Sequence, residues 1–331
     1  MYNIDLSAFP TDLQQILLKF YQDKYTDAVI NMKDKNLILT DESLLSVIKA
    51  EINIFKRLWN RDNLPYLNKN DLCLNKHNIG MLDLPHIKKV IWELISDYKN
   101  NEFNLELFNI DLIDTLSTIF SIRKSEIKKV PDVINTEISD LLALKENKSA
   151  VLNSDTEDTY KNFALCHHCY EKPKVNEYSA EIVTGECYRN EKYYSKFRLP
   201  KFSMTEVVFW GDEEKLFEHR EEILFLFLCI GESLGEKYRI KIANDSFLSD
   251  NLEVILYQIL NKSKLELEVY SSEENKYISI ASLNFHGSYF TRKFSITSDN
   301  QSYLQSMCVG FGLNRISEIF KEIKNGTVYN C

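Results

Sequence analysis

The sequence lacks the features of a membrane or secreted protein. Its longest apolar run, Ile223 to Ile230, is far too short to span a bilayer. The first residues, MYNIDLSAFPTDLQQ, have neither the basic start nor the apolar stretch of a signal peptide. The seven cysteines show no regular spacing, which favours reduced thiols over a disulfide framework. We therefore expect a cytoplasmic protein with no membrane partner.

The sequence also lacks an excess of positive charge. Its 40 lysines and arginines are outnumbered by 49 aspartates and glutamates, so the formal net charge is −9. Binding to nucleic acid relies on many contacts from lysine and arginine to phosphate, and the first hundred residues show no dense basic stripe. A nucleic-acid partner, tRNA included, is therefore not expected. The 44% of hydrophobic residues indicates a globular protein, and 331 residues suffice for one large domain or two.

The first third of the chain is predicted to be mainly helical. Apolar residues recur at helical spacing over residues 10–30, 41–59 and 84–101, with Thr11 and Asp41 as N-caps of the first two helices. The pattern changes after residue 104, so we divide the chain into a helical region, 1–104, and a second domain, 105–331. That domain opens with a helix over 105–122 and a short edge-like strand around Pro131.

Strand patterns dominate from residue 160 onward. Three helices interrupt them, over 212–236, 252–263 and 312–325. Strands joined by hairpins or long returns indicate an antiparallel sheet with helices packed on it, which is an α+β fold. The predicted strands cover 180–189, 202–211, 238–245, 264–271, 277–285 and 289–297.

The segment from Gly185 to Gly211 carries charge in an unusual arrangement for a strand. Arg189 and Glu191 stand two apart, so a strand would place both on one face. Arginine suits phosphate because its planar fork donates two charge-assisted hydrogen bonds. Arg198 adds a second cation and Phe202 a flat apolar ring, so these groups could form a nucleotide site without a glycine-rich loop. The alternative is a charged hairpin with ordinary surface ion pairs.

Two sequence motifs resemble motifs of class II aminoacyl-tRNA synthetases. Arg189-x-Glu191 followed by RLPKFSMTE, which ends in Glu206, is similar to motif 2, and CVGFGLNRI, with Arg315, is similar to motif 3. Pro131 in KKVPDVI stands in the place of motif 1, the dimer-forming segment.

The combination with LCHHCY, SLNFHGSYF and SMCVGFG resembles the amino acid:[carrier protein] ligases, relatives of the atypical seryl-tRNA synthetases of methanogens. The resemblance spans roughly residues 105–320.

The resemblance implies an antiparallel class II sheet flanked by helices, and a homodimer. It implies an ATP-dependent enzyme that converts a small amino acid to an aminoacyl-adenylate and then transfers it to the phosphopantetheine thiol of a carrier protein. Two alternatives stay open. One is a true aminoacyl-tRNA synthetase, and the other is a catalytically silent, synthetase-like regulatory protein.

The resemblance also implies a zinc site. Cys166, Glu206 and Cys308 match the three zinc ligands of the family, and thiolate and carboxylate are ordinary zinc donors. The fourth position would receive the α-amino group of the substrate. Cys169, beside His167 and His168, is the alternative first ligand through a local C-x-x-C knuckle.

The remaining site residues follow from the same resemblance. Its implied catalytic residues are Arg189, Glu191 and Arg315, and the substrate would contact Glu206, Asn284 and His286. The ATP site would comprise Arg189, Glu191, Arg198, Phe202, Glu266 and Arg315, with Glu266 holding Mg²⁺. The sequence departs from the family pattern at Lys201, Thr205 and Asn314.

Overall fold

A computed structural model describes residues 2–9, 11–25, 28, 30–61, 73–74, 84–135, 159–170, 178–189, 193–235, 237–243, 258 and 261–325. The chain divides into two compact units, one formed by Met1–Cys73 with Ile242–Ser263 and the other by Leu74–Lys241 with Lys264–Cys331. The boundary after residue 104, which separates regions by function, stays a prediction.

The smaller unit combines two helices with a three-stranded antiparallel sheet of order β1-β3-β2. Asp34 and Lys35 form a two-residue hairpin loop between β2 and β3, and both have a positive φ, 48° and 61°, which suits the twist of the strands. Helices predominate as expected, but each strand has only four residues, too few for a clear alternating pattern. The elements are β1 (Tyr2–Asp5), α1 (Thr11–Lys24), β2 (Ile30–Lys33), β3 (Asn36–Leu39) and α2 (Ser43–Arg61).

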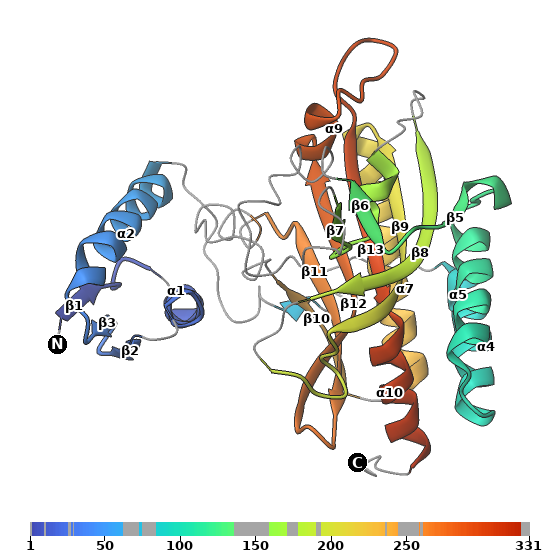
Figure 1. Cartoon of the computed structure of the whole chain (residues 1–331), viewed down its shortest axis with the longest axis horizontal. Coiled ribbons are helices and arrows are strands. Elements are labelled where there is room, and N and C mark those ends of the chain that lie inside the picture. The colour runs from blue at the N-terminus through green and yellow to red at the C-terminus, as the bar shows by residue number, and fades with distance from the viewer. Residues whose placement is uncertain are drawn as a thin grey trace. The chain divides into compact units, whose positions relative to one another are not determined.

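The larger unit is built on an eight-stranded sheet of order β4-β10-β11-β12-β13-β9-β8-β5. The five strands from β11 to β8 pair antiparallel, and β5 joins the edge of the sheet parallel to β8. The predicted α+β fold with an antiparallel sheet is thus confirmed (Figure 1). The strands are β4 (Cys73–Leu74), β5 (Ile127–Lys129), β8 (Ser179–Tyr188), β9 (Lys201–Gly211), β10 (Tyr238–Ile242), β11 (Lys264–Ser271), β12 (Lys276–Gly287) and β13 (Gln305–Gly312).

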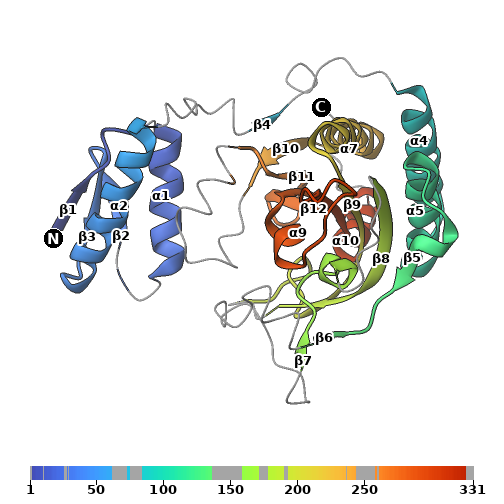
Figure 2. The same ribbon diagram turned by 90° about the horizontal axis from the view of Figure 1, so that it is seen from above.

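Helices cover one face of this sheet (Figure 2). α5 (Leu105–Ile119), α7 (Glu213–Leu234) and α10 (Leu313–Lys324) contact the strands, and α4 (Pro85–Asn100) packs against these three helices. Phe209 of β9 packs edge-on against Phe120 at the end of α5, and Phe311 of β13 packs against Phe227 of α7. The strand register places Phe209 and Phe311 on the same face of the sheet, so both helices pack on that face. The opposite face is the one that bears Glu206 and Cys308.

Polar side chains cap the starts of α5 and α7. The Asn104 side chain accepts hydrogen bonds from the backbone of Glu106 and Leu107, both at 3.0 Å, and so caps α5. The Asp212 side chain caps α7 through the Lys215 amide at 2.8 Å, and Gly235 ends that helix with φ 74°.

The predicted strand around Pro131 is divided in two. β5 ends at Lys129, and β6 (Val133–Asn135) pairs with β7 (Thr159–Lys161) in a separate two-stranded sheet. Proline has no backbone N–H to donate, so the ladder changes partner at this residue.

The strand predicted over 289–297 is wrong, because residues Tyr289–Lys293 form the short helix α9. Phe290 and Phe294, four residues apart, both pack on Tyr170 with ring centroids 5.1 and 5.5 Å away. Their spacing is helical, and the prediction mistook it for alternation. The helix predicted over 252–263 lies almost entirely outside the described residues. Among the helices that are described, none is long and apolar enough to cross a bilayer.

Gly231 marks the closest approach of α7 to β10. A Cβ at this position would lie 2.3 Å from the Tyr238 ring. We expect Gly231→Ala to lower the free energy of unfolding by about 1–3 kcal/mol, because overpacking forces the ring or the helix to move. Urea denaturation measures the change. Gly312→Ala is the matched control, since its Cβ would meet its nearest neighbour at 3.7 Å, an ordinary contact. Equal stability of the two variants would contradict this packing.

Candidate active site

The register of the central strands brings polar side chains onto the face opposite the helices. Glu206 of β9 lies opposite Gly310 of β13, and Cys308 of β13 lies opposite Asn284 of β12. Residues directly opposite in a ladder share a face, and alternate residues of each strand do so too. Glu206, Cys308 and Asn284 therefore point to the same side of three neighbouring strands.

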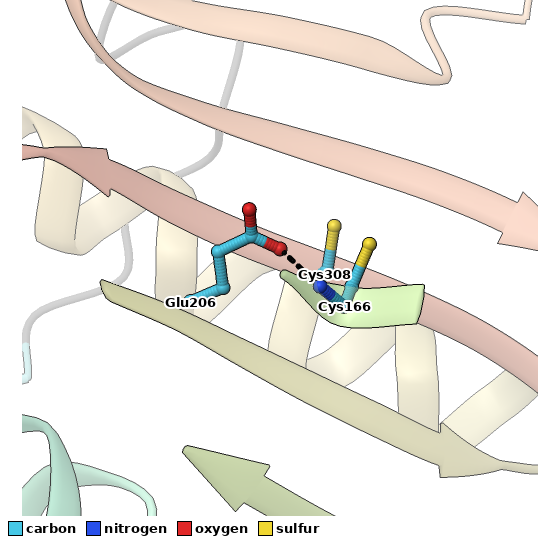
Figure 3. Close-up of side chains that lie close together, drawn as sticks. All are labelled: Cys166, Glu206 and Cys308. Carbon is cyan, nitrogen blue, oxygen red and sulfur yellow. Dashed lines mark hydrogen bonds between the residues drawn. The ribbon is translucent and has the colours of Figure 1, made fainter. Parts of the chain in front are cut away.

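Cys166 joins this face from a distant part of the chain. It begins the 3₁₀ turn Cys166–Tyr170, and its sulfur, the Cys308 sulfur and a carboxylate oxygen of Glu206 lie within 4.8 Å of one another (Figure 3). All three side chains are buried. Cys169 is not a member of this group.

Glu206 holds the turn in place through both of its oxygens. Oε1 accepts the amide of Leu165 at 3.1 Å, and Oε2 accepts the amide of Cys166 at 2.9 Å. Burial raises the pKa of this carboxyl to about 7, and the neighbouring Cys308 adds to the shift. Gly310 leaves room for the carboxylate, because a Cβ there would lie 3.3 Å from Glu206 Cγ and 3.1 Å from Met204 Cε.

The pKa values of the two thiols are shifted in opposite directions by the hydrogen bond between them. A hydrogen bond from Cys166 lowers the pKa of Cys308 well below its usual range, and the same bond, with burial, raises the pKa of Cys166. A buried group of two sulfurs and a carboxylate accumulates negative charge that a divalent cation can neutralise in place of protons. Two thiolates and a carboxylate also form a donor set typical of zinc. The residues present therefore fit a metal ion.

A polar network continues from Cys308 across β12. Asn284 Nδ2 and His286 Nε2, two residues apart on β12, each lie 3.6 Å from the Cys308 sulfur. Tyr170 connects His286 Nδ1, at 3.2 Å, to the Ser306 hydroxyl, at 3.0 Å. Lys264 of β11 donates to Asn284 Oδ1 at 3.0 Å.

Three members of this network were not predicted from the sequence. Tyr170 and Ser306 stand in the segments LCHHCY and SMCVGFG, but the resemblance assigns no role to them or to Lys264. Of the three, only Lys264 gave a signal in the sequence, because it is a lysine at a strand position that is usually apolar when the strand is buried. Lys264 is 7% exposed.

The histidines of the 3₁₀ turn face other partners. His168 Nε2 pairs with Asn162 Oδ1 at 2.8 Å, and the His167 ring packs against Phe163 and Phe290. Burial lowers the pKa of His167 to about 3 and that of His168 to about 4, so both stay neutral.

Arg189 and Phe202 lie together farther along the same face. The Arg189 guanidinium carbon stands 5.1 Å from the centre of the Phe202 ring. Phe202 is four residues from Glu206 on β9 and lies opposite Cys187 of β8, and Arg189 is two residues beyond Cys187. Both therefore lie on the face of the sheet that bears Glu206. Glu191, predicted beside them, lies outside the described residues.

Arg198 and Arg315, two more of the predicted nucleotide residues, have contacts of their own. Arg198 stacks on Tyr193 with its guanidinium carbon 4.9 Å from the ring centre. Arg315, in the first turn of α10, donates to the Phe197 carbonyl at 2.8 Å and to the Ser279 carbonyl at 3.0 Å. Glu266 is half-buried and opposite Ser282, on the face of Asn284.

Related proteins are known for part of the chain. No protein-family model matches it. Amino acid–[acyl-carrier-protein] ligases 1 and 2 of Bradyrhizobium diazoefficiens are 26% and 28% identical over 136 residues, which is 41% of this chain and 42% and 41% of theirs. The type-2 serine–tRNA ligase of Methanopyrus kandleri is 27% identical over 126 residues, 36% of this chain and 24% of that protein. The chain thus spans about two fifths of the length of the two ligases.

Solved structures share the fold. The M. kandleri seryl-tRNA synthetase, in complex with A. aeolicus tRNASec, has a TM-score of 0.52 and 15% identity over 91% of this chain and 70% of its own. The Pyrococcus horikoshii seryl-tRNA synthetase with ATP has a TM-score of 0.50 and 11% identity over 82% of this chain and 63% of its own. The chain is therefore a homologue of the amino acid–[acyl-carrier-protein] ligases and of the type-2 serine–tRNA ligases, and it has the class II synthetase fold.

Proposed function

We propose that this protein activates an amino acid with ATP and transfers the aminoacyl group to the phosphopantetheine thiol of a carrier protein. The observation that carries the proposal is the buried group of Cys166, Glu206 and Cys308, on the sheet face that also bears Arg189 and Phe202. One end of this face can hold an amine through a metal, and the other can hold a nucleotide. An amino acid between them would present its carboxylate to ATP.

The metal in this proposal is zinc. Bound by the two sulfurs and the carboxylate, it would supply a Lewis-acid position for the neutral α-amine of the substrate. Asn284 and His286 would border that position, since both contact Cys308. Small amino acids such as glycine, alanine or serine are the expected substrates, by resemblance to the ligases.

The nucleotide would lie along β8 and β9. Arg189 would stabilise the charge that develops as the substrate carboxylate attacks the α-phosphate, and Arg198 would reach the terminal phosphates. Phe202 and Arg315 would enclose the adenine, Glu191 would accept a hydrogen bond from an amine, and Glu266 would hold Mg²⁺. No side chain acts as a nucleophile, so positioning and electrostatics would supply the rate. The homodimer and the cytoplasmic location are part of the same proposal.

Aminoacylation of tRNA is the second candidate, because the serine–tRNA ligase of M. kandleri matches the chain as well as the two carrier-protein ligases do in identity. The net charge of −9 counts against tRNA, since tRNA binding needs many cationic contacts.

We expect the purified protein to hold about one zinc ion per chain, because three protein donors converge on one buried point. Cys308→Ser should lose the metal, whereas Cys169→Ser, the matched control three residues from Cys166, should keep it. Inductively coupled plasma mass spectrometry gives the stoichiometry. Full metal content in Cys308→Ser, or full activity after chelation, would contradict the site.

Amino-acid-dependent exchange of pyrophosphate into ATP, without tRNA, tests activation directly. Arg189→Ala should slow the exchange on the order of 10²–10³-fold, the usual cost of losing one contact that stabilises transition-state charge. Lys215→Ala is the control, because Lys215 pairs with Glu218 on the exposed start of α7. Exchange at the wild-type rate in Arg189→Ala would show that motif 2 is misassigned.

Transfer to a carrier protein separates the two candidates. With ATP and the amino acid, the holo-carrier should gain the aminoacyl mass as a hydroxylamine-sensitive thioester, while the apo-carrier, lacking the thiol, should not. Added salt should weaken transfer, because an acidic carrier needs a basic surface. Exposed Lys124 and Lys129 offer one, whereas Arg239 and Lys241 already pair with Glu268. Label that accumulates on tRNA and never on a holo-carrier would favour the synthetase.

A further inference from the structure

The connection between β8 and β9 carries Arg198 and is fixed at its tip. Ser195 and Arg198 exchange backbone hydrogen bonds of 3.0 and 2.9 Å across a tight turn. Phe197, within the turn, is only 4% exposed. The turn Ser195–Arg198 is therefore held by its own hydrogen bonds and by the burial of Phe197.

Lys196 ties this turn to two other parts of the larger unit. Its ammonium donates to Glu322 of α10 at 2.8 Å and also to Glu273 in the turn between β11 and β12. The Ser271 hydroxyl donates to the same oxygen of Glu322 at 2.7 Å. One cation thus joins three chain segments around a carboxylate that is 5% exposed.

Arg315 holds the same turn from the other side. Its guanidinium donates to the Phe197 carbonyl, the residue between Lys196 and Arg198. The Lys196 ammonium also stands 4.9 Å from the centre of the Phe197 ring. The position of Arg198 is therefore set by contacts that α10 makes to the two residues before it.

We infer that Lys196 and Glu322 are positioning residues that hold the β8–β9 turn where Arg198 can meet ATP. The inference rests on the proposed function, because it assigns the pair a part in nucleotide binding. The contacts described above join Lys196 and Glu322 to each other, to Glu273 and to Ser271. The pair would act on ATP binding through Arg198, because it raises the fraction of molecules in which the turn is in place.

The energetics favour this turn-holding role. Glu322 is buried, so its charge needs the Lys196 partner, and removal of one member of such a pair leaves the other uncompensated. A turn that is anchored in only a tenth of molecules would bind its ligand about tenfold more weakly, since apparent affinity scales with the competent fraction.

Four variants test the inference. Lys196→Met removes the charge and keeps an unbranched side chain one atom shorter, Glu322→Gln keeps the shape of the partner, and Lys196→Arg restores a cation. Lys321→Met is the matched control, because Lys321 is next to Glu322 on α10 but pairs with Glu318 on the exposed face. All four are first checked for wild-type metal content and thermal unfolding.

In pyrophosphate exchange, Lys196→Met should raise KM for ATP about tenfold, with kcat and the amino acid KM changed less than twofold. Lys196→Arg should recover most of the loss, Glu322→Gln should show an intermediate rise, and Lys321→Met none. A pair with a merely structural role would lower stability or active fraction without this split between KM and kcat.

Calorimetric titration with a non-hydrolysable ATP analogue keeps the two proposals apart. A wild-type protein that binds no analogue would contradict the proposed function. A wild type that binds it, beside Lys196→Met with an unchanged dissociation constant, would contradict the positioning role alone. Trypsin reports on the turn without nucleotide: cleavage after Arg198 should be faster in Glu322→Gln than in Lys321→Met, and equal rates would show that the pair does not hold the turn.

Discussion

The register between β9, β13 and β12 is the constraint on which the candidate site depends. A one-residue slip of β13 would turn Cys308 toward the helices and bring Val309 to the face of Glu206. The helix-covered face prevents such a slip, since Phe209 and Phe311 are buried there to 1% exposure or less. The free energy that fixes the donors on one face of the sheet therefore comes from apolar burial on the other.

Glu206 links this sheet to the part of the site that the sheet does not supply. Its two oxygens accept hydrogen bonds from the consecutive backbone amides of Leu165 and Cys166. Glu206 is therefore a candidate metal ligand itself and also positions Cys166, a second candidate ligand. A buried carboxylate needs such hydrogen bonds to offset the loss of water. The pKa of Glu206 is nevertheless raised to about 7, first by burial, and a cation in the group would remove that penalty.

The sequence predicted the fold, and the resemblance singled out Cys166, Glu206 and Cys308, which the structure brings together; that they bind a metal stays a prediction. The sequence could not supply the partners of Cys308 beyond β12, since Tyr170 and Ser306 meet only through tertiary packing. Its failures were local as well. Phe290 and Phe294 are four residues apart, a spacing that fits both a strand and a helix. The contact that both rings make with Tyr170 is tertiary and could not be seen in the sequence. Four-residue strands in the smaller unit gave too little periodicity to detect.

The three departures from the family pattern have partners away from the donor group. Thr205 lies on the helix-covered face, where its hydroxyl meets Asn109 of α5 and Thr184 of β8 at 2.5 and 3.0 Å. Asn314 accepts the Ser203 amide at 2.7 Å and so joins α10 to β9, while Lys201 is exposed and stands 3.9 Å from Asp132. Thr205 and Asn314 therefore help to hold β9 against its helices, and Lys201 lies at the start of that strand, so none of the three replaces a donor. α10 also carries Arg315 and Glu322, which contact the β8–β9 turn. The hydrogen bond to Asn314 therefore links β9, the strand that bears Glu206, to the same helix, so α10 contacts both the metal-ligand strand and the turn that carries Arg198.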